Sequence, residues 1–182
     1  LGAPVYQLLG GACKSSVGYA GYLFIDDPQM NAKRALAYKE QGYTEIKMKV
    51  GRDLKNDLDT LAAIRSAIGY DIKLRVDANM NWSVPTAIKW IKAMQPYDIQ
   101  YVEQPVPDYD LDGMAAVRRA VDVPIASDES CSSVERVLQM IKRESCDVFV
   151  VYVSEAGGLT RARTIASIAD ACGKWCAMGT WA

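Results

Sequence analysis

The segment EIKMKV at residues 45–50, followed by an amphipathic stretch and then by KLRV at residues 73–76, decides the fold. Both short runs are rich in apolar residues and have the length of strands. The stretch between them predicts a helix, because its apolar residues recur at steps of three and four. These residues are Leu54, Leu58, Leu61, Ile64 and Ile68. A strand, a helix and a second strand in this order indicate parallel strands joined by a crossover helix.

The same alternation continues from about residue 17 to the end of the chain. The nearly continuous apolar run Val148–Val151 fits a strand that is covered on both faces. Seven strands and six helices predict an α/β fold, a (β/α)8 TIM-type barrel that lacks one unit. No G-x-G-x-x-G follows the first strand, which disfavours a dinucleotide-binding open sheet. The predicted strands cover residues 17–23, 45–50, 73–76, 99–102, 124–126, 148–153 and 175–178.

The chain has 182 residues, whereas such barrels typically take about 250. It begins without an initiator Met and ends shortly after a predicted strand. No linker or low-complexity stretch divides it. We therefore expect residues 1–182 to form one partial barrel domain of a longer protein.

Composition narrows the possible functions. Lys and Arg number 21 and Asp and Glu 22, so the chain has no basic field for nucleic acid or an anionic membrane. No apolar run approaches the ~18–20 residues of a membrane span. The chain has no histidine, which excludes His-ligated zinc and Ser-His-Asp catalysis within it. Five irregularly spaced cysteines predict free thiols in the reducing cytoplasm.

Polar residues lie where the predicted strands end, which is where a barrel of this type builds its active site. Lys47 and Lys49 point to one side of their strand because side chains alternate with a period of two. Asp77, Glu103 and Asp128 follow at intervals of one strand–helix unit. Three converging carboxylates repel one another unless a cation lies between them, and hard oxygen donors suit Mg²⁺. In the alternative interpretation, each acid caps the following helix.

These motifs resemble those of the enolase superfamily, and more closely its mandelate racemase/muconate lactonizing enzyme family. The resemblance covers essentially the whole chain. It implies an enolase-like C-terminal barrel domain, with the N-terminal capping domain and the last barrel strand outside this chain. The motifs are PVYQLLGG at residues 4–11, Lys47-x-Lys49, Asp77-x-Asn79, Glu103-Gln104-Pro105, Asp128-Glu129 and Gly157-Gly158-Leu159.

The resemblance also implies a chemistry. Asp77, Glu103 and Asp128 would bind one Mg²⁺ that holds the carboxylate of a small-molecule acid. Lys49 would remove the proton α to that carboxylate, with Lys47 as its electrostatic helper. The products would be those of a cycloisomerase, an epimerase or racemase, or an acid dehydratase acting through an enolate, and the enzyme would be a homo-oligomer. The supporting residues of the motifs are Asn79, Gln104 and Glu129.

The chain departs from the family pattern on the sixth strand. Lactonizing-type members carry a second catalytic Lys where this chain has Tyr152. Racemase-type members carry an Asp there, paired with a His on strand seven, which is absent here. The ending Gly179-Thr180 resembles the lactonizing branch. The second acid or base is therefore Tyr152, or Glu155 if the match to the family motif is shifted along the chain, or no residue. In the alternative interpretation, the Tyr152 ring only fills space.

Losing the second Lys favours chemistry with one base, such as β-elimination or cycloisomerisation, over racemisation with two. A lysine base requires a pKa well below its usual ~10.4, and a like charge, a cation and burial all lower it. Two rival functions remain open at this point. One is a Schiff-base aldolase that uses Lys49, and the other is a non-catalytic barrel that keeps only the metal.

Overall fold

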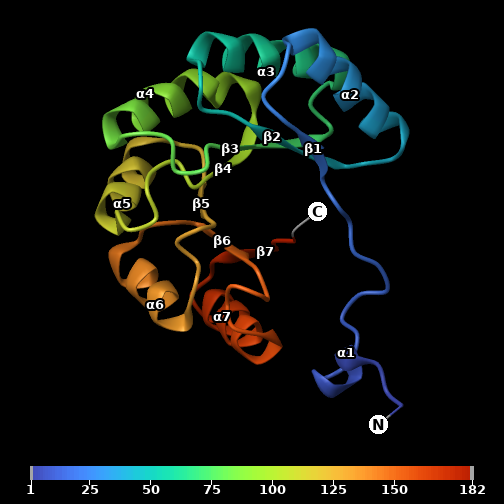
Figure 1. The fold of residues 1–182 in the computed structure, drawn as a ribbon, viewed down its shortest axis with the longest axis vertical. Coiled ribbons are helices and arrows are strands. Elements are labelled where there is room, and N and C mark those ends of the chain that lie inside the picture. The colour runs from blue at the N-terminus through green and yellow to red at the C-terminus, as the bar shows by residue number, and fades with distance from the viewer. Residues whose placement is uncertain (1, 181–182) are drawn as a thin grey trace.

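The computed structural model describes residues 2–180, and in them seven parallel strands form one sheet in sequence order. Figure 1 shows the strands as an inner layer that curves round, with successive helices outside it. This confirms the predicted α/β architecture, an incomplete (β/α)8-type barrel. The strands are β1 (Gly21–Leu23), β2 (Glu45–Lys49), β3 (Lys73–Asp77), β4 (Ile99–Glu103), β5 (Ile125–Ser127), β6 (Val148–Val151) and β7 (Trp175–Met178).

Six helices alternate with the strands, as the sequence predicts, and a short helix α1 (Val5–Leu8) comes before them. Helix α1 lies apart from the curved sheet (Figure 1) and buries none of its residues. A single turn of 3₁₀ helix, η1 (Gln95–Tyr97), leads into β4. The six helices are α2 (Pro28–Glu40), α3 (Leu54–Ile68), α4 (Val84–Met94), α5 (Leu111–Ala120), α6 (Val134–Arg143) and α7 (Leu159–Ala171).

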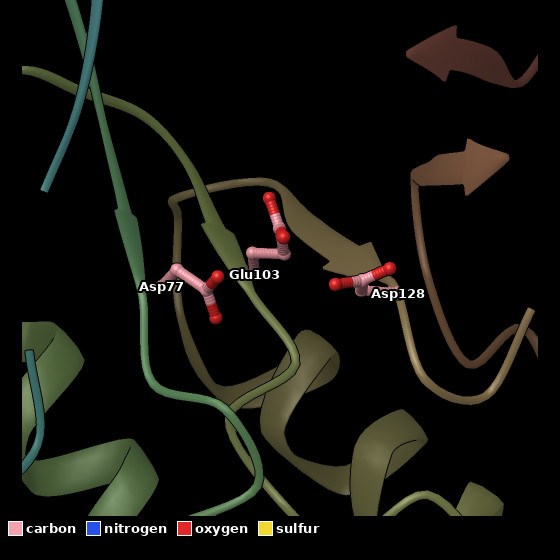
Figure 2. A group of neighbouring side chains, drawn as sticks. All are labelled: Asp77, Glu103 and Asp128. Atoms are coloured by element: carbon pink, nitrogen blue, oxygen red, sulfur yellow. The ribbon is translucent and has the colours of Figure 1, made fainter. Parts of the chain in front are cut away.

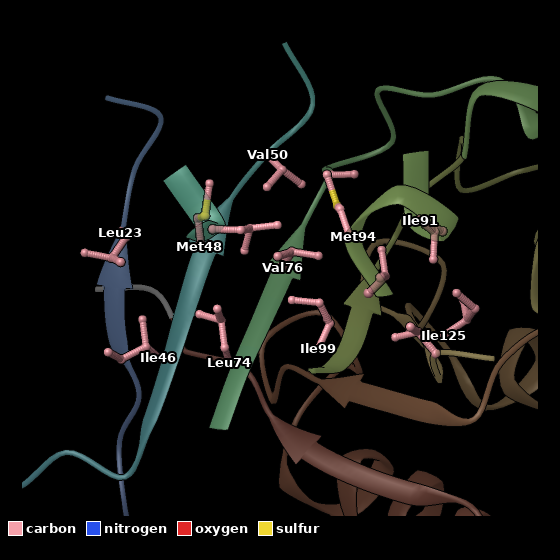
Figure 3. Packing of buried hydrophobic residues seen from close by; sticks show 14 of the residues in the cluster. Leu23, Ile46, Met48, Val50, Leu74, Val76, Ile91, Met94, Ile99 and Ile125 are labelled. Carbon is pink, nitrogen blue, oxygen red and sulfur yellow. The ribbon is translucent and has the colours of Figure 1, made fainter. Parts of the chain in front are cut away.

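Strand β2 shows how one sequence serves both the core and the site. Ile46 and Met48 are buried in the large apolar cluster that packs the strands against the helices (Figure 3). The intervening Lys47 and Lys49 point the other way, to the inside of the curved sheet, because successive side chains alternate. The same holds for β6, where Phe149 packs outward and Val148 belongs to a small inner cluster.

The ends of several helices carry residues that are typical of helix caps and stops. Ser83 caps α4 by accepting a hydrogen bond from the backbone N–H of Thr86, and Pro85 lies in the first turn. Gly42 and Gly173 each follow a helix with positive φ, at 87° and 64°. This left-handed conformation suits glycine and reverses the chain towards the next strand.

Two strand boundaries differ from the prediction by more than one residue. Strand β1 begins at Gly21 rather than Val17, and Val17 and Tyr19 are exposed. Strand β6 ends at Val151 rather than Val153, because the following carbonyls close a turn. The carbonyl of Tyr152 accepts the N–H of Ala156, and the carbonyl of Val153 accepts the N–H of Gly158. Tyr152 therefore lies one residue beyond the strand.

Two other sequence-based expectations concern the cysteines and membrane-spanning segments. All five cysteines are free, with Cys131 and Cys146 buried and the other three exposed. Across residues 2–180, none of the helices combines the length and apolar character that a bilayer crossing needs.

Candidate active site

The carboxyl ends of the neighbouring strands bring the predicted site residues to one edge of the sheet. Lys49, Asp77 and Glu103 are the last residues of β2, β3 and β4. The parallel register places Lys49 beside Asp77 and Asp77 beside Glu103. Asp128 follows β5 directly. The predicted spacing of one strand–helix unit thus translates into side-by-side residues.

Asp77, Glu103 and Asp128 converge, as Figure 2 shows. Each offers an oxygen atom within 4.8 Å of those of the other two. Their exposed fractions are only 0%, 1% and 8%. Within residues 2–180, no other group of three acidic, cysteine or histidine side chains has a geometry that could hold a metal ion.

Burial and mutual repulsion make this carboxylate cluster unfavourable without a counter-charge. Burial, followed by the charge of Asp77, raises the pKa of Glu103 to about 8. Burial, followed by the charge of Glu129, raises the pKa of Asp128 to about 6. A divalent cation among the three would relieve both effects. Oxygen donors alone are the set that Mg²⁺ prefers, so the residues present fit this ion.

Both predicted lysines reach the same carboxylate. Lys47 Nζ lies 2.8 Å from Asp77 Oδ2 and also contacts Glu103 Oε1, while Lys49 Nζ lies 2.6 Å from that Asp77 oxygen. Burial raises the pKa of Asp77, but the two ammonium groups outweigh it and lower the pKa overall. Burial likewise lowers the pKa of Lys47, and the charges of Glu103 and Asp77 outweigh it and raise the pKa overall. Lys47 is therefore held as an ammonium ion.

The two lysines differ in access. The side chain of Lys47 is 4% exposed, whereas that of Lys49 is 25% exposed. Lys49 also donates a hydrogen bond to Asn79 Oδ1 over 2.6 Å, and Asn79 Nδ2 donates to Glu129 Oε1 over 3.1 Å. The supporting residues Asn79 and Glu129 thus form a chain that ends at Lys49.

Gln104 has a different place, between the ends of β4 and β5. Its Nε2 donates to the carbonyl of Val106 and to Ser130 Oγ, and its Oε1 accepts the N–H groups of Asp128 and Ser130. The side chain is fully buried, and φ is 36°. With its amide fully hydrogen-bonded, Gln104 fixes the loop of Asp128 against the strand that carries Glu103.

Tyr152 lies on the inner side of the sheet, where it packs against the small inner cluster that contains Val148. With Lys47, Glu103 and Gly179 it lines a narrow gap, and Glu155 is not among the lining residues. A Cβ at Gly179 would lie 2.1 Å from Tyr152 Cε2, so a larger residue at this position would displace the ring. Burial, followed by the charge of Asp128, raises the pKa of the Tyr152 hydroxyl.

The sequence analysis missed the layer beneath the carboxylates. Arg75 and Tyr101 lie two residues before Asp77 and Glu103 and so share their face of the sheet. Arg75 Nη1 donates to the Tyr101 hydroxyl over 2.7 Å. Tyr22, on β1, places its ring 5.6 Å from Lys47 Nζ. The period-two pattern on each strand was the signal that could have found these residues.

The fold and the site define the class of protein, and comparison with known families agrees. A family model described as "Enolase C-terminal domain-like" matches residues 30–182. The chain therefore belongs to the enolase C-terminal domain-like family, in the mandelate racemase/muconate lactonizing enzyme family of the enolase superfamily.

Several relatives are similar over almost the whole chain. A hydrophobic dipeptide epimerase from Enterococcus faecalis is 37% identical over 179 residues, which are 98% of this chain and 50% of the relative. A 3,6-anhydro-α-L-galactonate cycloisomerase from Streptomyces coelicolor is 35% identical over 92% of this chain and 47% of its own. A crystal structure of a Cytophaga hutchinsonii dipeptide epimerase with Mg and D-Ala-L-Val superposes with a TM-score of 0.93, at 34% identity, over 98% of this chain and 48% of the other.

The relatives are named for different substrates and for several related reactions. Besides epimerases and the cycloisomerase, they include an N-succinyl-L-Arg/Lys racemase from Bacillus cereus and a cis-3-hydroxy-L-proline dehydratase from Roseibium aggregatum. These are isomerases and a lyase, which agrees with the enzyme class predicted from the sequence. The chain spans about half the length of the curated relatives it matches.

Proposed function

We propose that this chain is the catalytic barrel of a Mg²⁺-dependent isomerase or lyase, which removes the proton α to the carboxylate of a small acid. The observation that carries the proposal is the convergence of three buried carboxylates with Lys47 and Lys49 at one edge of the sheet. Membership of the enolase C-terminal domain-like family supports it. Removal of an α-proton does not require a Schiff base at Lys49, so we do not propose an aldolase.

Asp77, Glu103 and Asp128 would hold the metal. The chemistry that bound Mg²⁺ supplies is Lewis-acid stabilisation of the negative charge that develops on the substrate as its α-proton leaves. Lys49 is the candidate base, because its side chain is partly exposed and ends β2 at the edge of the sheet where the carboxylates lie. The buried ammonium of Lys47 adds a fixed positive charge that stabilises the same developing negative charge.

Tyr152 decides between the reactions that such a site can perform. A tyrosine hydroxyl keeps its proton at neutral pH because its ordinary pKa is ~10, and burial raises that pKa further. The hydroxyl is therefore a poor second base, and the role open to it is that of a proton donor or hydrogen-bond donor. This favours one-base chemistry, β-elimination or cycloisomerisation, which the dehydratase and cycloisomerase among the relatives perform by name. The similarity to the Enterococcus faecalis epimerase supports epimerisation as the second candidate.

The direct test is solvent exchange at the α-carbon in ²H₂O, followed by NMR. The probes are D-Ala-L-Val, N-succinyl-L-Arg, cis-3-hydroxy-L-proline and 3,6-anhydro-α-L-galactonate, the substrate types that the names of the relatives give. We expect the protein that carries this chain to exchange or convert one of them only when Mg²⁺ is present. Absence of exchange and turnover with all four, or turnover that persists in excess chelator, would contradict the proposal.

Replacing Tyr152 by Phe tests whether the hydroxyl of this residue takes part in the reaction. The substitution keeps the ring beside Gly179 and removes only the hydroxyl. If the hydroxyl protonates a leaving group, turnover should fall by roughly 10²–10⁴-fold while Mg²⁺ affinity measured by calorimetry stays unchanged. Turnover within a few-fold of the original protein would show that Tyr152 is a filler ring.

A further inference from the structure

Glu129 lies next to Asp128 but points its carboxylate at an amide rather than at the carboxylate cluster. Its Oε1 accepts a hydrogen bond from Asn79 Nδ2 over 3.1 Å. Its Oε2 is buried and has no hydrogen-bond partner among the described residues. A half-buried carboxylate with one oxygen unpaired is costly to keep, so its single hydrogen bond to Asn79 has to be explained.

An asparagine amide has two unlike ends, and Glu129 determines which end faces which way. A carboxylate accepts hydrogen bonds and does not donate them, so the NH₂ group of Asn79 must face Glu129. The carbonyl oxygen of Asn79 then faces the opposite way, where it accepts a hydrogen bond from Lys49 Nζ over 2.6 Å. With the amide reversed, an NH₂ group would face the ammonium of Lys49 instead.

The backbone around Asn79 supports a constrained position. Asn79 has a φ of 43°, in the left-handed region, and its N–H donates to Asp77 Oδ1 over 2.9 Å. The amide therefore hangs from the loop directly after a proposed metal ligand, at the end of the strand next to that of Lys49. Two contacts then fix the ammonium of Lys49, one to Asp77 and one to Asn79.

We infer that Glu129 is a positioning residue for Lys49: it orients the amide of Asn79, whose carbonyl oxygen holds Lys49 Nζ. The inference rests on the proposed role of Lys49 as the base. Among the described residues, Glu129 is hydrogen-bonded to Asn79 and Asn79 to Lys49, so we expect its effect on Lys49 to pass through Asn79. A double-mutant cycle separates this route from a direct electrostatic effect on the neighbouring Asp128.

The experiment compares the original protein with Glu129→Gln, Asn79→Ala and the double variant at saturating Mg²⁺. The probe is whichever of the four acids above the original protein converts. Glu129→Gln keeps the size of the side chain but allows either orientation of Asn79. We expect each single variant to lower kcat by about 10–100-fold with KM changed less than about threefold. The double variant should be no slower than Asn79→Ala alone. Glu135→Gln, on the exposed side of α6, is the matched control and should change nothing.

A second readout needs neither metal nor substrate. In ¹⁵N-lysine-labelled protein, the Nζ signal of Lys49, assigned by its loss in Lys49→Ala, should move in Glu129→Gln and in Asn79→Ala. An unmoved signal, or a Glu129→Gln effect on kcat that is equally large in the Asn79→Ala background, would overturn the inference. An original protein that converts none of the four acids would contradict the proposed function, whereas an active protein indifferent to Glu129→Gln would contradict this inference alone.

Discussion

Lys49→Ala should reduce α-proton exchange by at least about 10³-fold, while Lys47→Ala should slow it and leave it measurable. A general base supplies roughly 10²–10⁴-fold of rate, and Lys49 is the lysine whose side chain is partly exposed. Lys47 is buried as an ammonium against Asp77 and Glu103, so it can contribute its charge but is not free to take a proton. The measurement is deuterium incorporation from ²H₂O, followed by NMR.

The two lysine variants serve as controls for each other. Both remove one positive charge from the same strand, so a shared electrostatic effect would lower exchange equally in both. Deuterium entering the substrate at the original rate in Lys49→Ala would show that another group takes the proton. Circular dichroism should show the same helix content in both variants.

The second large effect is expected for substitutions of the three clustered carboxylates. We expect Asp77→Asn, Glu103→Gln and Asp128→Asn each to weaken Mg²⁺ binding by about 100-fold or more, because even groups that only support metal ligands contribute 10–100-fold. Each should also abolish turnover. The fold should survive, since the substitutions preserve side-chain size, and Glu103→Gln and Asp128→Asn also reduce the charge repulsion inside a buried cluster. Isothermal calorimetry measures the affinity.

The matched control for this set is Asp147→Asn. Asp147 comes just before β6, at the opposite end of the strands, where it pairs with Arg118 over 2.7 Å. Its loss should leave Mg²⁺ binding unchanged. Unchanged affinity in all three of the site variants would remove the metal assignment.

The repeating pattern of the chain made most of the fold predictable. Strand β7 has the predicted bounds, and β2, β3 and β4 end within one residue of theirs, because alternation and helical stripes repeat in every unit. The larger errors in the strand bounds fall at the start of β1 and the end of β6, where a loop adjoins the strand. Val17 and Tyr19 are apolar enough for a strand, but both are exposed, and the pairing of β1 with β2 starts only at Gly21. Tyr152 and Val153 continue an apolar run, but their carbonyls bond within a turn.

The position of the site was also predictable, whereas its internal connections were not. Strand ends at equal spacing placed Asp77, Glu103 and Asp128 side by side, because parallel strands end at one edge. The hydrogen bonds of Gln104 and of Asn79 depend on left-handed backbone at both residues. No propensity scale predicts such conformations for Gln. The roles proposed for these residues remain predictions that the variants above test.

Gly179 and Tyr152 constrain each other's substitution. A methyl group at position 179 would lie 2.1 Å from Tyr152 Cε2, so a larger residue at position 179 requires the ring to move. A residue without a ring at position 152 would remove this overlap. Engineering of the edge formed by β7 therefore has to treat positions 152 and 179 as a pair.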